Sequence, residues 1–468
     1  MATVTAPPSA PARLDRPGLA WALFEGGRIP YVIMLSVVFM PYFAKTVVGD
    51  AVAGQAEVAN FAKYAGFVAA CTAPLLGALL DQRGRRKPWI VAFMAVLVSV
   101  VAMLWFAEPD AAGLPVATIV VLLVLGKLFY TYTEMLHNSL LAAAAAGGSM
   151  ARLSGLSITI GATSGFLFLI FILLTIVLPT QGGVSFVPAE PLFGLDTESY
   201  QHLRIVPLFA AALLVAASLP LLLFARDYPP TRKSWGASFD GAFAYLGGLV
   251  GHLKARPNAA KFLLARMVYA DGITATSIFT GVLAAGVMGW SATELLLLGI
   301  GQLAAAAAGA HVFARLDMRV GSKRALQIML TGMIVVLIAV VGTAPDRIVF
   351  VPLGGEAAAF WDGPAFTRAT DLIFLALLLA KTGLASGTSA SSRALLGALS
   401  PASEAGAYFG LYAMAGTVTA WLAPLAIGWA TQATGSQQAG FVPVIVLLAI
   451  GLALLATVKT AATAEKHA

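Results

Sequence analysis

The stretch that decides the fold is the polar turn at residues 77–87, which reads Gly77-Ala-Leu-Leu-Asp81-Gln-Arg83-Gly84-Arg85-Arg86-Lys87. It closes an apolar run at 58–80 and precedes another at 88–107. Each run is about as long as the roughly 20 residues that a helix needs to cross a bilayer. A cationic turn between two such runs indicates that the chain reverses direction at a membrane surface.

The overall composition agrees with a membrane protein. Of the 468 residues, 59% are hydrophobic and 11% are charged, whereas soluble domains have roughly 45–50% apolar and about 25% charged residues. The composition excludes a soluble or a disordered chain, and the long unbroken apolar runs exclude an outer-membrane barrel. With one cysteine, Cys71, and no metal-ligand cluster, phosphate loop or nucleophile motif, we expect no enzyme activity, cofactor or metal.

Apolar runs of spanning length recur along the whole chain and are separated by polar breaks. They predict an all-α polytopic membrane protein with twelve transmembrane helices. The approximate spans are 21–46, 58–80, 88–107, 115–140, 153–178, 204–225, 261–287, 292–313, 325–343, 370–392, 405–430 and 441–458.

The spans divide into two similar sets of six. A second basic turn, which contains Asp317, Gly321 and Arg324, also lies between the second and third spans of its set, and Gly84 and Gly321 are 237 residues apart. Two such pseudo-symmetric six-helix halves predict a transporter with its site at their interface. The expected division is a flexible N-terminal tail (1–20), an N-terminal half (21–225), a cytoplasmic linker with a short interfacial helix (226–258), a C-terminal half (259–460) and a C-terminal tail (461–468).

The lysines and arginines orient the chain in the membrane. Nineteen of them lie on the side that holds both termini, and five lie on the other side. The positive-inside rule therefore predicts cytoplasmic termini. The net charge of +7 is then a topology signal and not a sign of nucleic-acid binding. We expect a multi-pass protein of the bacterial inner membrane that works as a monomer.

The first basic turn, G-x-x-x-D-x-x-G-R-R-K after a second span, resembles the signature loop of the major facilitator superfamily. The resemblance implies the major facilitator fold. It also implies that Gly77, Asp81, Gly84, Arg85 and Arg86 form a conformational latch; a plain positive-inside loop is the alternative. In the second turn Met318 stands at the aligned acidic position, so a symmetric second latch is not expected.

Several further segments resemble the vacuole-effluxer-like branch of that superfamily. They include Trp21-Ala-Leu-Phe-Glu25, Phe262-Leu-Leu-Ala-Arg266-Met-Val-Tyr269-Ala-Asp271-Gly272 and Tyr408-Phe-Gly-Leu-Tyr412-Ala. Eukaryotic members of the branch are implicated in amino-acid release from the vacuole. Glu25, Arg28 and Thr417 replace the residues usual in the family at polar cavity positions, so the resemblance does not carry over a substrate.

Charged residues inside the spans are the main functional signal, because each costs roughly 2.5–3.5 kcal/mol at mid-membrane unless it has a partner or a wet cavity. Seven such residues fall on spans 1, 4, 7 and 10, the helices that line the cavity in the major facilitator fold. In span 4 they belong to a polar stripe that steps by three and four residues. The predicted cavity residues are Glu25, Arg28, Lys127, Tyr130, Glu134, His137, Arg266, Tyr269, Asp271 and Lys381.

Some of these residues also have purely structural interpretations. Glu25 can pair with Arg28 alone, since the two share a helix face. His137 is equally compatible with a solvated helix end, and Arg266 can extend its charged end to the cytoplasmic surface. The tyrosines of these spans can be packing residues.

The charges predict a secondary active transporter of a small polar solute, coupled to protons and working by alternating access. Three acids and four bases weakly favour an amino acid or another carboxylate-bearing substrate. Glu134 and Asp271 are the candidates for reversible protonation. The alternatives are a uniporter or exchanger, and a transporter-derived receptor that moves nothing.

Overall fold

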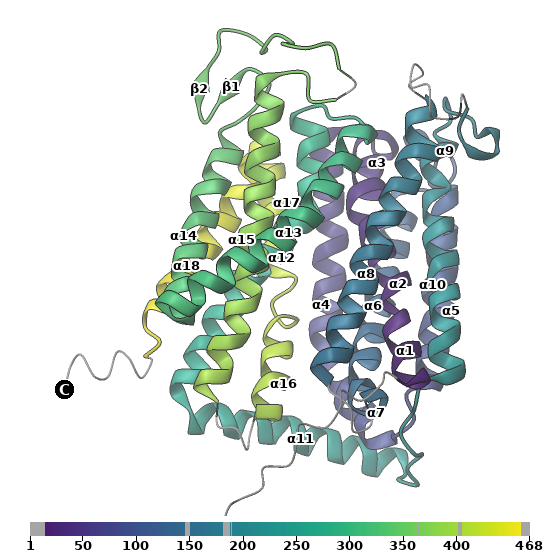
Figure 1. Cartoon of the computed structure of the whole chain (residues 1–468), viewed down its shortest axis with the longest axis vertical. Helices are drawn as coiled ribbons and strands as arrows, with labels where there is room; N and C mark the ends of the chain where they lie inside the picture. The colour runs from purple at the N-terminus through teal and green to yellow at the C-terminus, as the bar shows by residue number, and fades with distance from the viewer. Residues whose placement is uncertain are drawn as a thin grey trace, which may run out of the picture.

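The computed structural model describes residues 15–145, 150–180, 188, 190–363, 365–400 and 405–459. Two bundles of long, roughly parallel helices stand side by side, and the helix α11 (Trp235–Ala255) lies across one end of both (Figure 1). A two-stranded hairpin, β1 (Arg347–Ile348) and β2 (Val351–Pro352), lies at the opposite end. We call these the linker end and the hairpin end.

The N-terminal bundle contains six spanning segments. The first combines α1, α2, two π-helical segments and α3, and the last combines α9 and α10. Its elements are α1 (Arg16–Leu23), α2 (Glu25–Ile33), η1 (Met34–Phe39), α3 (Met40–Tyr42), η2 (Phe43–Val47), α4 (Ala51–Arg83), α5 (Lys87–Met103), η3 (Leu104–Phe106), η4 (Pro109–Ala111), α6 (Val116–Ser139), α7 (Leu141–Ala145), α8 (Met150–Ile172), η5 (Leu173–Val177), η6 (Leu178–Thr180), η7 (Leu192–Gly194), α9 (Gln201–Arg204) and α10 (Val206–Phe224).

The C-terminal bundle repeats this arrangement with one difference, in its fifth segment. Its helices are α12 (Pro257–Val287), α13 (Ala292–Val320), α14 (Ser322–Val341), α15 (Ala369–Leu399), α16 (Ala405–Ala415), α17 (Leu422–Thr434), η9 (Ala439–Phe441) and α18 (Val442–Ala456). The fifth segment is formed by α16 and α17, which are separated by turns at residues 416–421.

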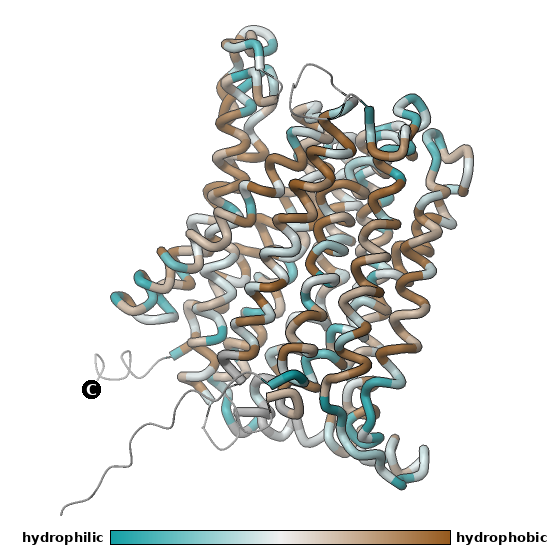
Figure 2. The backbone as a smooth tube through the Cα atoms, turned by 45° about the vertical axis from the view of Figure 1, so that its right-hand side comes forward, coloured by the Kyte–Doolittle hydropathy of each residue, from teal (hydrophilic) through white to brown (hydrophobic). Residues whose placement is uncertain are grey.

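Eleven helices of the described part of the chain are long and apolar enough to cross a membrane. Their apolar residues occupy the middle of the bundles, and polar residues gather at the two ends (Figure 2). These helices match eleven of the twelve predicted spans. The remaining predicted span, the eleventh (405–430), coincides with α16 and α17, which are separated by the turns at residues 416–421.

Helix ends also differ from the predicted boundaries. α4, α13 and α15 extend beyond their predicted spans, because backbone hydrogen bonding continues past the point where the sequence becomes polar. The predicted flexible tail 1–20 is wrong for residues 16–20, which begin α1 with the Asp15 carboxylate accepting from the Gly18 amide at 3.0 Å. Residues 1–14 and the predicted tail 461–468 lie outside the described residues.

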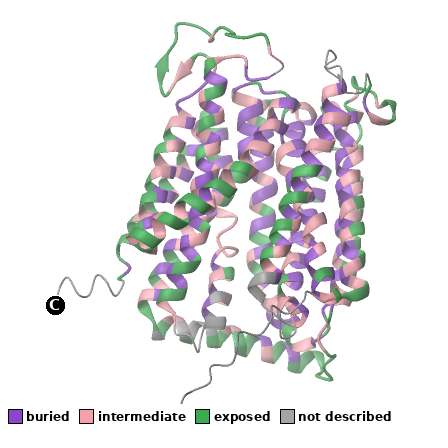
Figure 3. Ribbon diagram, in the orientation of Figure 1, coloured by how far each residue is buried: buried purple, intermediate pink, exposed green. Residues whose placement is uncertain are grey.

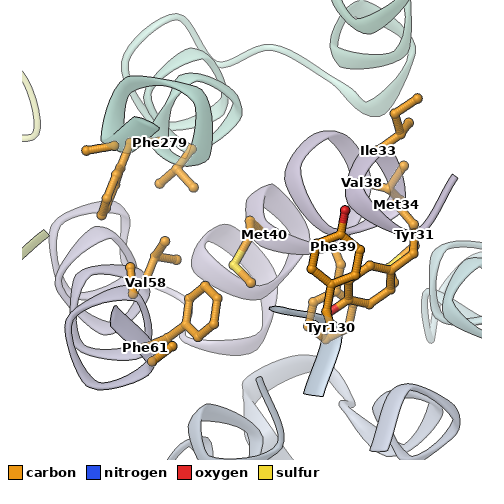
Figure 4. Close-up of a cluster of buried hydrophobic side chains, with 14 of the residues drawn as sticks. Tyr31, Ile33, Met34, Val38, Phe39, Met40, Val58, Phe61, Tyr130 and Phe279 are labelled. Atoms are coloured by element: carbon orange, nitrogen blue, oxygen red, sulfur yellow. The ribbon is translucent and has the colours of Figure 1, made fainter. Parts of the chain in front are cut away.

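The first span occupies the centre of the molecule. Its apolar side chains Met34, Phe39 and Met40 are at most 1% exposed. Figure 4 shows them between Phe61 of α4, Tyr130 of α6 and Phe279 of the C-terminal bundle. The cluster therefore joins the two halves through the span that also carries Glu25 and Arg28.

The two bundles contact each other directly near the hairpin end. There Gln55 of α4 donates to Thr431 Oγ1 at 2.8 Å and to the Gln437 carbonyl at 2.9 Å. Gln437 in turn donates to the Ala51 carbonyl at 2.7 Å. All three hydrogen bonds cross between the bundles, and we call them the Gln55 clasp. The hairpin end is therefore the closed end of this conformation.

The linker end is organised differently. α11 is largely exposed (Figure 3), but Ala242 is fully buried against Ala78 and Leu79 of α4. Ser234 caps this helix by accepting from the Ala237 amide at 3.2 Å. The linker therefore contains a helix of 21 residues that lies across the linker end of both bundles and packs against α4.

Candidate functional site: two polar clusters on the central helices

Arg28 of α2 is the centre of the polar cluster in the N-terminal half. It is 4% exposed, and it forms ion pairs with Glu25 and with Glu134 of α6, the latter at 2.7 Å between Nη2 and Oε1. Its Nη2 also donates to the Tyr130 hydroxyl at 2.9 Å. The i,i+3 spacing in α2 and the i,i+4 spacing in α6 place all four side chains on facing sides of the two helices. The Glu134 side chain is 42% exposed, so water reaches one side of the cluster.

His137 and Lys127 lie at the two ends of the same α6 stripe. The His137 ring is fully buried, stacks on Trp21 with 4.4 Å between ring centroids, and has Nε2 2.9 Å from the Trp21 carbonyl. Its Nδ1 is 3.6 Å from the Glu25 carboxylate. The alternative of a solvated His137 is therefore wrong, because α1 covers this helix end. Lys127 has its ammonium 5.4 Å from the centre of the Tyr130 ring and makes no ion pair within the described residues.

Asp271 is the buried acid of the C-terminal half. It is 3% exposed, and its Oδ2 accepts a hydrogen bond from the Ala423 amide at 2.8 Å. Ala423 is the second residue of α17, which begins directly after the break in span 11. The first amides of a helix lack partners within it, and the helix dipole favours a negative charge there. No cation lies within 4 Å of this carboxylate among the described residues.

Arg266, on the same helix as Asp271, holds the other side of the break. Its Nη1 donates to the Tyr412 carbonyl at 2.6 Å, and its guanidinium lies 3.4 Å from the centre of the Tyr412 ring. The alternative in which Arg266 extends to the surface is therefore wrong. The carbonyl of Met267 accepts from Thr419 Oγ1 at 2.9 Å. One turn and a half of α12 thus contacts α16, the break and α17.

The break itself was not predicted, although a weak signal exists. The segment Gly416-Thr417-Val418-Thr419 combines glycine with three β-branched residues, all of them poor helix formers. Hydropathy alone does not reveal the low helix propensity of this segment, because valine and the neighbouring Ala and Leu residues keep the run apolar. A Cβ at position 416 would lie 3.0 Å from Arg266 Nη1, so the glycine leaves room for the guanidinium.

Lys381 and Tyr269 occupy separate positions in the C-terminal half. Lys381 is 2% exposed, and its ammonium donates to Thr280 Oγ1 at 2.5 Å and to the Thr276 carbonyl at 3.4 Å. The Tyr269 hydroxyl lies 2.8 Å from Ser392 Oγ. The structure does not bring Lys381 into an ion pair with Asp271. The predicted residues therefore form one connected cluster in the N-terminal half and several smaller ones in the C-terminal half.

The predicted latch residues lie at the linker end, and one ion pair joins them. Arg86 Nη2 is 2.6 Å from Asp81 Oδ1, whereas Arg85 is exposed and pairs with no described acid. Gly84 has φ +82°, and a Cβ there would lie 2.1 Å from the Pro229 carbonyl. At Gly77 a Cβ would lie 3.0 Å from the Met135 sulfur. Both glycines therefore permit close approach of a neighbouring segment.

The sequence did not single out Asp227, which contacts the same turn as the predicted latch residues. Its carboxylate accepts from the backbone amides of Arg86 at 2.8 Å and of Lys87 at 3.1 Å, which caps the start of α5. In the second half Asp317 accepts from Ser322 Oγ at 2.7 Å and forms no ion pair with a described residue. The second turn, whose sequence differs from the latch pattern, therefore also has a different local structure, with a hydrogen bond to Ser322 where the first turn has an ion pair to Arg86.

The candidate site therefore has two parts. The first is Arg28 with its two glutamate partners, of which Glu134 is partly exposed to water. The second is the buried carboxylate of Asp271, which contacts the start of α17 directly after the break in the helix. Such discontinuous helices at mid-membrane bind substrates and coupling ions in transporters. The described residues hold no group of three or more His, Cys, Asp or Glu side chains arranged as metal ligands. The side chains present can bind charged solute groups, exchange protons and exchange ion-pair partners.

Comparison with known proteins agrees with this architecture. A family model described as "Vacuole effluxer Atg22 like" matches residues 64–467. The chain is 23% identical over 447 residues to the uncharacterized MFS-type transporter YxiO of Bacillus subtilis (strain 168), which covers 94% of both chains. A mutant of the nucleoside transporter NupG superposes with a TM-score of 0.63 at 12% identity, over 94% of this chain and 100% of that one. A mutant of the E. coli fucose:proton symporter FucP superposes with a TM-score of 0.54 at 14% identity, over 94% and 99%. The chain therefore belongs to the vacuole effluxer Atg22-like family, a branch of the major facilitator superfamily of membrane transporters.

Proposed function

We propose that this transporter is a proton-coupled symporter of a small polar solute, with a carboxylate-bearing solute such as an amino acid favoured. It works by alternating access in the bacterial inner membrane, with the linker end and both termini in the cytoplasm. The excess of lysine and arginine in the turns at the linker end supports this orientation.

One observation carries the proton assignment, the contact between Asp271 and the start of α17. The Asp271 carboxylate is buried and accepts a hydrogen bond from the Ala423 amide at the start of α17. Within the described residues it has no cationic partner. When this carboxyl group takes up a proton, its attraction to the helix terminus weakens. Protonation of Asp271 therefore alters how α12 holds α17, which belongs to the interface between the halves through Thr431.

The Arg28 cluster is the proposed solute site. Its guanidinium is shared between Glu25 and Glu134, so a solute carboxylate can replace Glu134 while the more buried Glu25 stays paired. The displaced Glu134 carboxylate is partly exposed to water, so it is not left as an unpaired buried charge. The ammonium of Lys127 adds a cation, and Glu134 offers a carboxylate to an ammonium group of the solute. The exposed side of Glu134 provides the route from water.

The closed Gln55 clasp supports alternating access. In the present conformation the halves are joined at the hairpin end, and transport requires these contacts to open while the linker end closes. The ion pair of Asp81 with Arg86 lies at that second end, where the relative position of the halves must also change.

The test is transport in proteoliposomes by the wild type and by Asp271→Asn. We expect the variant to keep solute exchange between the two sides and to lose accumulation driven by an inward proton gradient. Asp317→Asn is the matched control, because it removes an acid of the same half at the linker end, and it should keep both activities. Wild-type accumulation in Asp271→Asn would refute the proton assignment.

The other predicted functions give different outcomes in the same experiment. A uniporter or exchanger shows exchange with no response to the proton gradient in the wild type. A receptor that moves nothing binds solute in a thermal-shift assay, where a ligand stabilises the folded protein by mass action, but shows no flux in sealed vesicles.

A further inference from the structure

A cavity lies at the hairpin end, outside both polar clusters. It has a volume of about 280 Å³ and is lined by residues of both halves. The N-terminal half contributes Pro41, Tyr42 and Lys45 from the end of the first span, and the C-terminal half contributes Trp290 and Leu295 from the turn and helix that follow α12. None of the residues in the Arg28 cluster, and neither Asp271 nor Arg266, lines it.

The lining of this cavity has a distinct chemistry. Its walls are mainly apolar and aromatic. The polar residues among those that line it include Lys45, Thr46, His202 and Ser291, and the described lining holds no acid. Lys45 is exposed at the rim and pairs with no acid among the described residues. Pockets for small molecules combine mainly apolar walls with a few polar groups that fix orientation. A single unpaired ammonium at the rim of an apolar cavity matches a molecule with one negative group and an apolar body.

The walls of the cavity are held in place independently of any ligand. The Tyr42 hydroxyl donates to the Ala107 carbonyl at 2.7 Å, and the Trp290 indole donates to Asp371 Oδ1 at 2.9 Å. Trp290 is 1% exposed and packs edge-on against Phe374. The two aromatic walls are thus preformed, one in each half, and ligand binding does not have to order them.

We propose that this cavity is a separate binding site for a small apolar carboxylate from the hairpin side of the membrane, with Lys45 pairing to the carboxylate group. Because the walls come from both halves, opening of the hairpin end separates them. A ligand that binds only the closed arrangement stabilises it. The bound carboxylate therefore keeps the hairpin end closed and slows transport. This inference does not depend on proton coupling or on the solute of the proposed function.

The test uses the purified full chain, with benzoate as the probe and benzyl alcohol as its uncharged counterpart. In a Cys71→Ala background, Ala292→Cys places one thiol in the cavity wall of the C-terminal half. Modification of this thiol by a maleimide is measured against benzoate concentration. At ten times its Kd, benzoate should slow the modification about tenfold, because only about a tenth of the cavities then remain empty.

Two variants locate the effect. Lys45→Gln should raise the benzoate Kd about fivefold, as expected for the loss of one exposed ion pair. Lys63→Gln is the matched control, since Lys63 lies near the same end but bonds to Asn60 and does not line the cavity. Lys45 is exposed, so its substitution leaves the packing intact. Arg28→Gln should keep the protection, because Arg28 belongs to the proposed solute site.

Several results would overturn the proposal. These are no protection by benzoate, equal protection by benzyl alcohol, an unchanged Kd in Lys45→Gln, and protection that disappears in Arg28→Gln while surviving in Lys45→Gln. For the conformational part, distances between spin labels at the hairpin end should shift toward the closed population with benzoate. A shift toward the open population would refute the claim that bound benzoate holds the two halves together at the hairpin end.

Discussion

Replacing Gln55 by leucine is expected to open the hairpin end of the protein. Gln55 is fully buried and donates two hydrogen bonds across the interface between the halves, to Thr431 Oγ1 and to the Gln437 carbonyl. These bonds exist only while the hairpin end is closed. Leucine has a similar size but donates nothing, so Gln55→Leu weakens the closed state without creating a large cavity.

The magnitude follows from the two bonds. A typical hydrogen bond contributes about 1 kcal/mol net, and a buried acceptor left without a donor costs a further 1–3 kcal/mol or so. Water can reach the same acceptors once the hairpin end opens, so the penalty applies to the closed state. We expect the free energy of the closed state to rise by about 2–3 kcal/mol relative to the open state, which changes the population ratio about 30- to 150-fold.

The assay is a distance distribution between two spin labels at the hairpin end. Ala112→Cys and Ala433→Cys place exposed labels on opposite halves, in the Cys71→Ala background. Gln438→Leu is the matched control. Its amide donates to the Thr343 carbonyl at 2.9 Å and its oxygen accepts from Arg347, so its bonds stay within one half. That variant should lower the melting temperature without changing the distances.

The reasoning is refuted if Gln55→Leu and Gln438→Leu give the same distance distribution as the wild type. It is also refuted if both variants shift the distribution equally, since the effect would then be a general loss of stability and not the loss of contacts between the halves.

Three further variants test other parts of the structure. Gly84→Ala should lower the melting temperature clearly more than Gly321→Ala. Both glycines have φ near +80°, where an alanine costs about 1–3 kcal/mol, but only at Gly84 would the added Cβ collide with the Pro229 carbonyl of the linker. Equal losses in melting temperature would contradict the docking of the linker. Lys381→Met should keep or raise the melting temperature, because it removes a buried charge that pairs with no acid among the described residues. Transport should fall at least tenfold, because a charged side chain kept inside a membrane span despite its cost is expected to be functional. A large loss of stability would show that the lysine is structural. Arg28→Gln should lower the free energy of unfolding by about 2 kcal/mol. This is less than for a fully buried ion pair, because Glu134 is partly exposed to water. An unchanged thermal unfolding curve would contradict the ion-pair cluster.

The helices were largely predictable because membrane insertion depends on local composition. A run of about 20 apolar residues must form a helix to satisfy its backbone in lipid, so eleven of the described spanning helices match predicted spans. The same locality explains the failure at residues 416–421. Whether a weak stretch such as Gly416-Thr417-Val418-Thr419 breaks depends on partners from α12, which compensate the freed backbone groups.

The candidate site was predictable as residue types and helices, but not as pairs. The i,i+3 and i,i+4 spacings placed Glu25 with Arg28 and placed Tyr130 with Glu134 on one face. That Arg28 joins both sets, and that His137 is covered by Trp21, depends on how α1 and α2 pack against α6. Such contacts join residues more than a hundred positions apart, and no local pattern encodes them.

By itself the sequence determined the membrane location, the helix positions, the repeat of two halves and the polar residues of the central helices. These follow from the cost of placing charge and unpaired backbone in lipid, a cost that each segment incurs alone. Only the tertiary structure decided that Asp271 faces the start of α17, that Arg86 rather than Arg85 pairs with Asp81, and that Gln55 closes the hairpin end. These contacts arise when helices from distant parts of the chain pack together, and the polar groups they bring together are satisfied only in that arrangement.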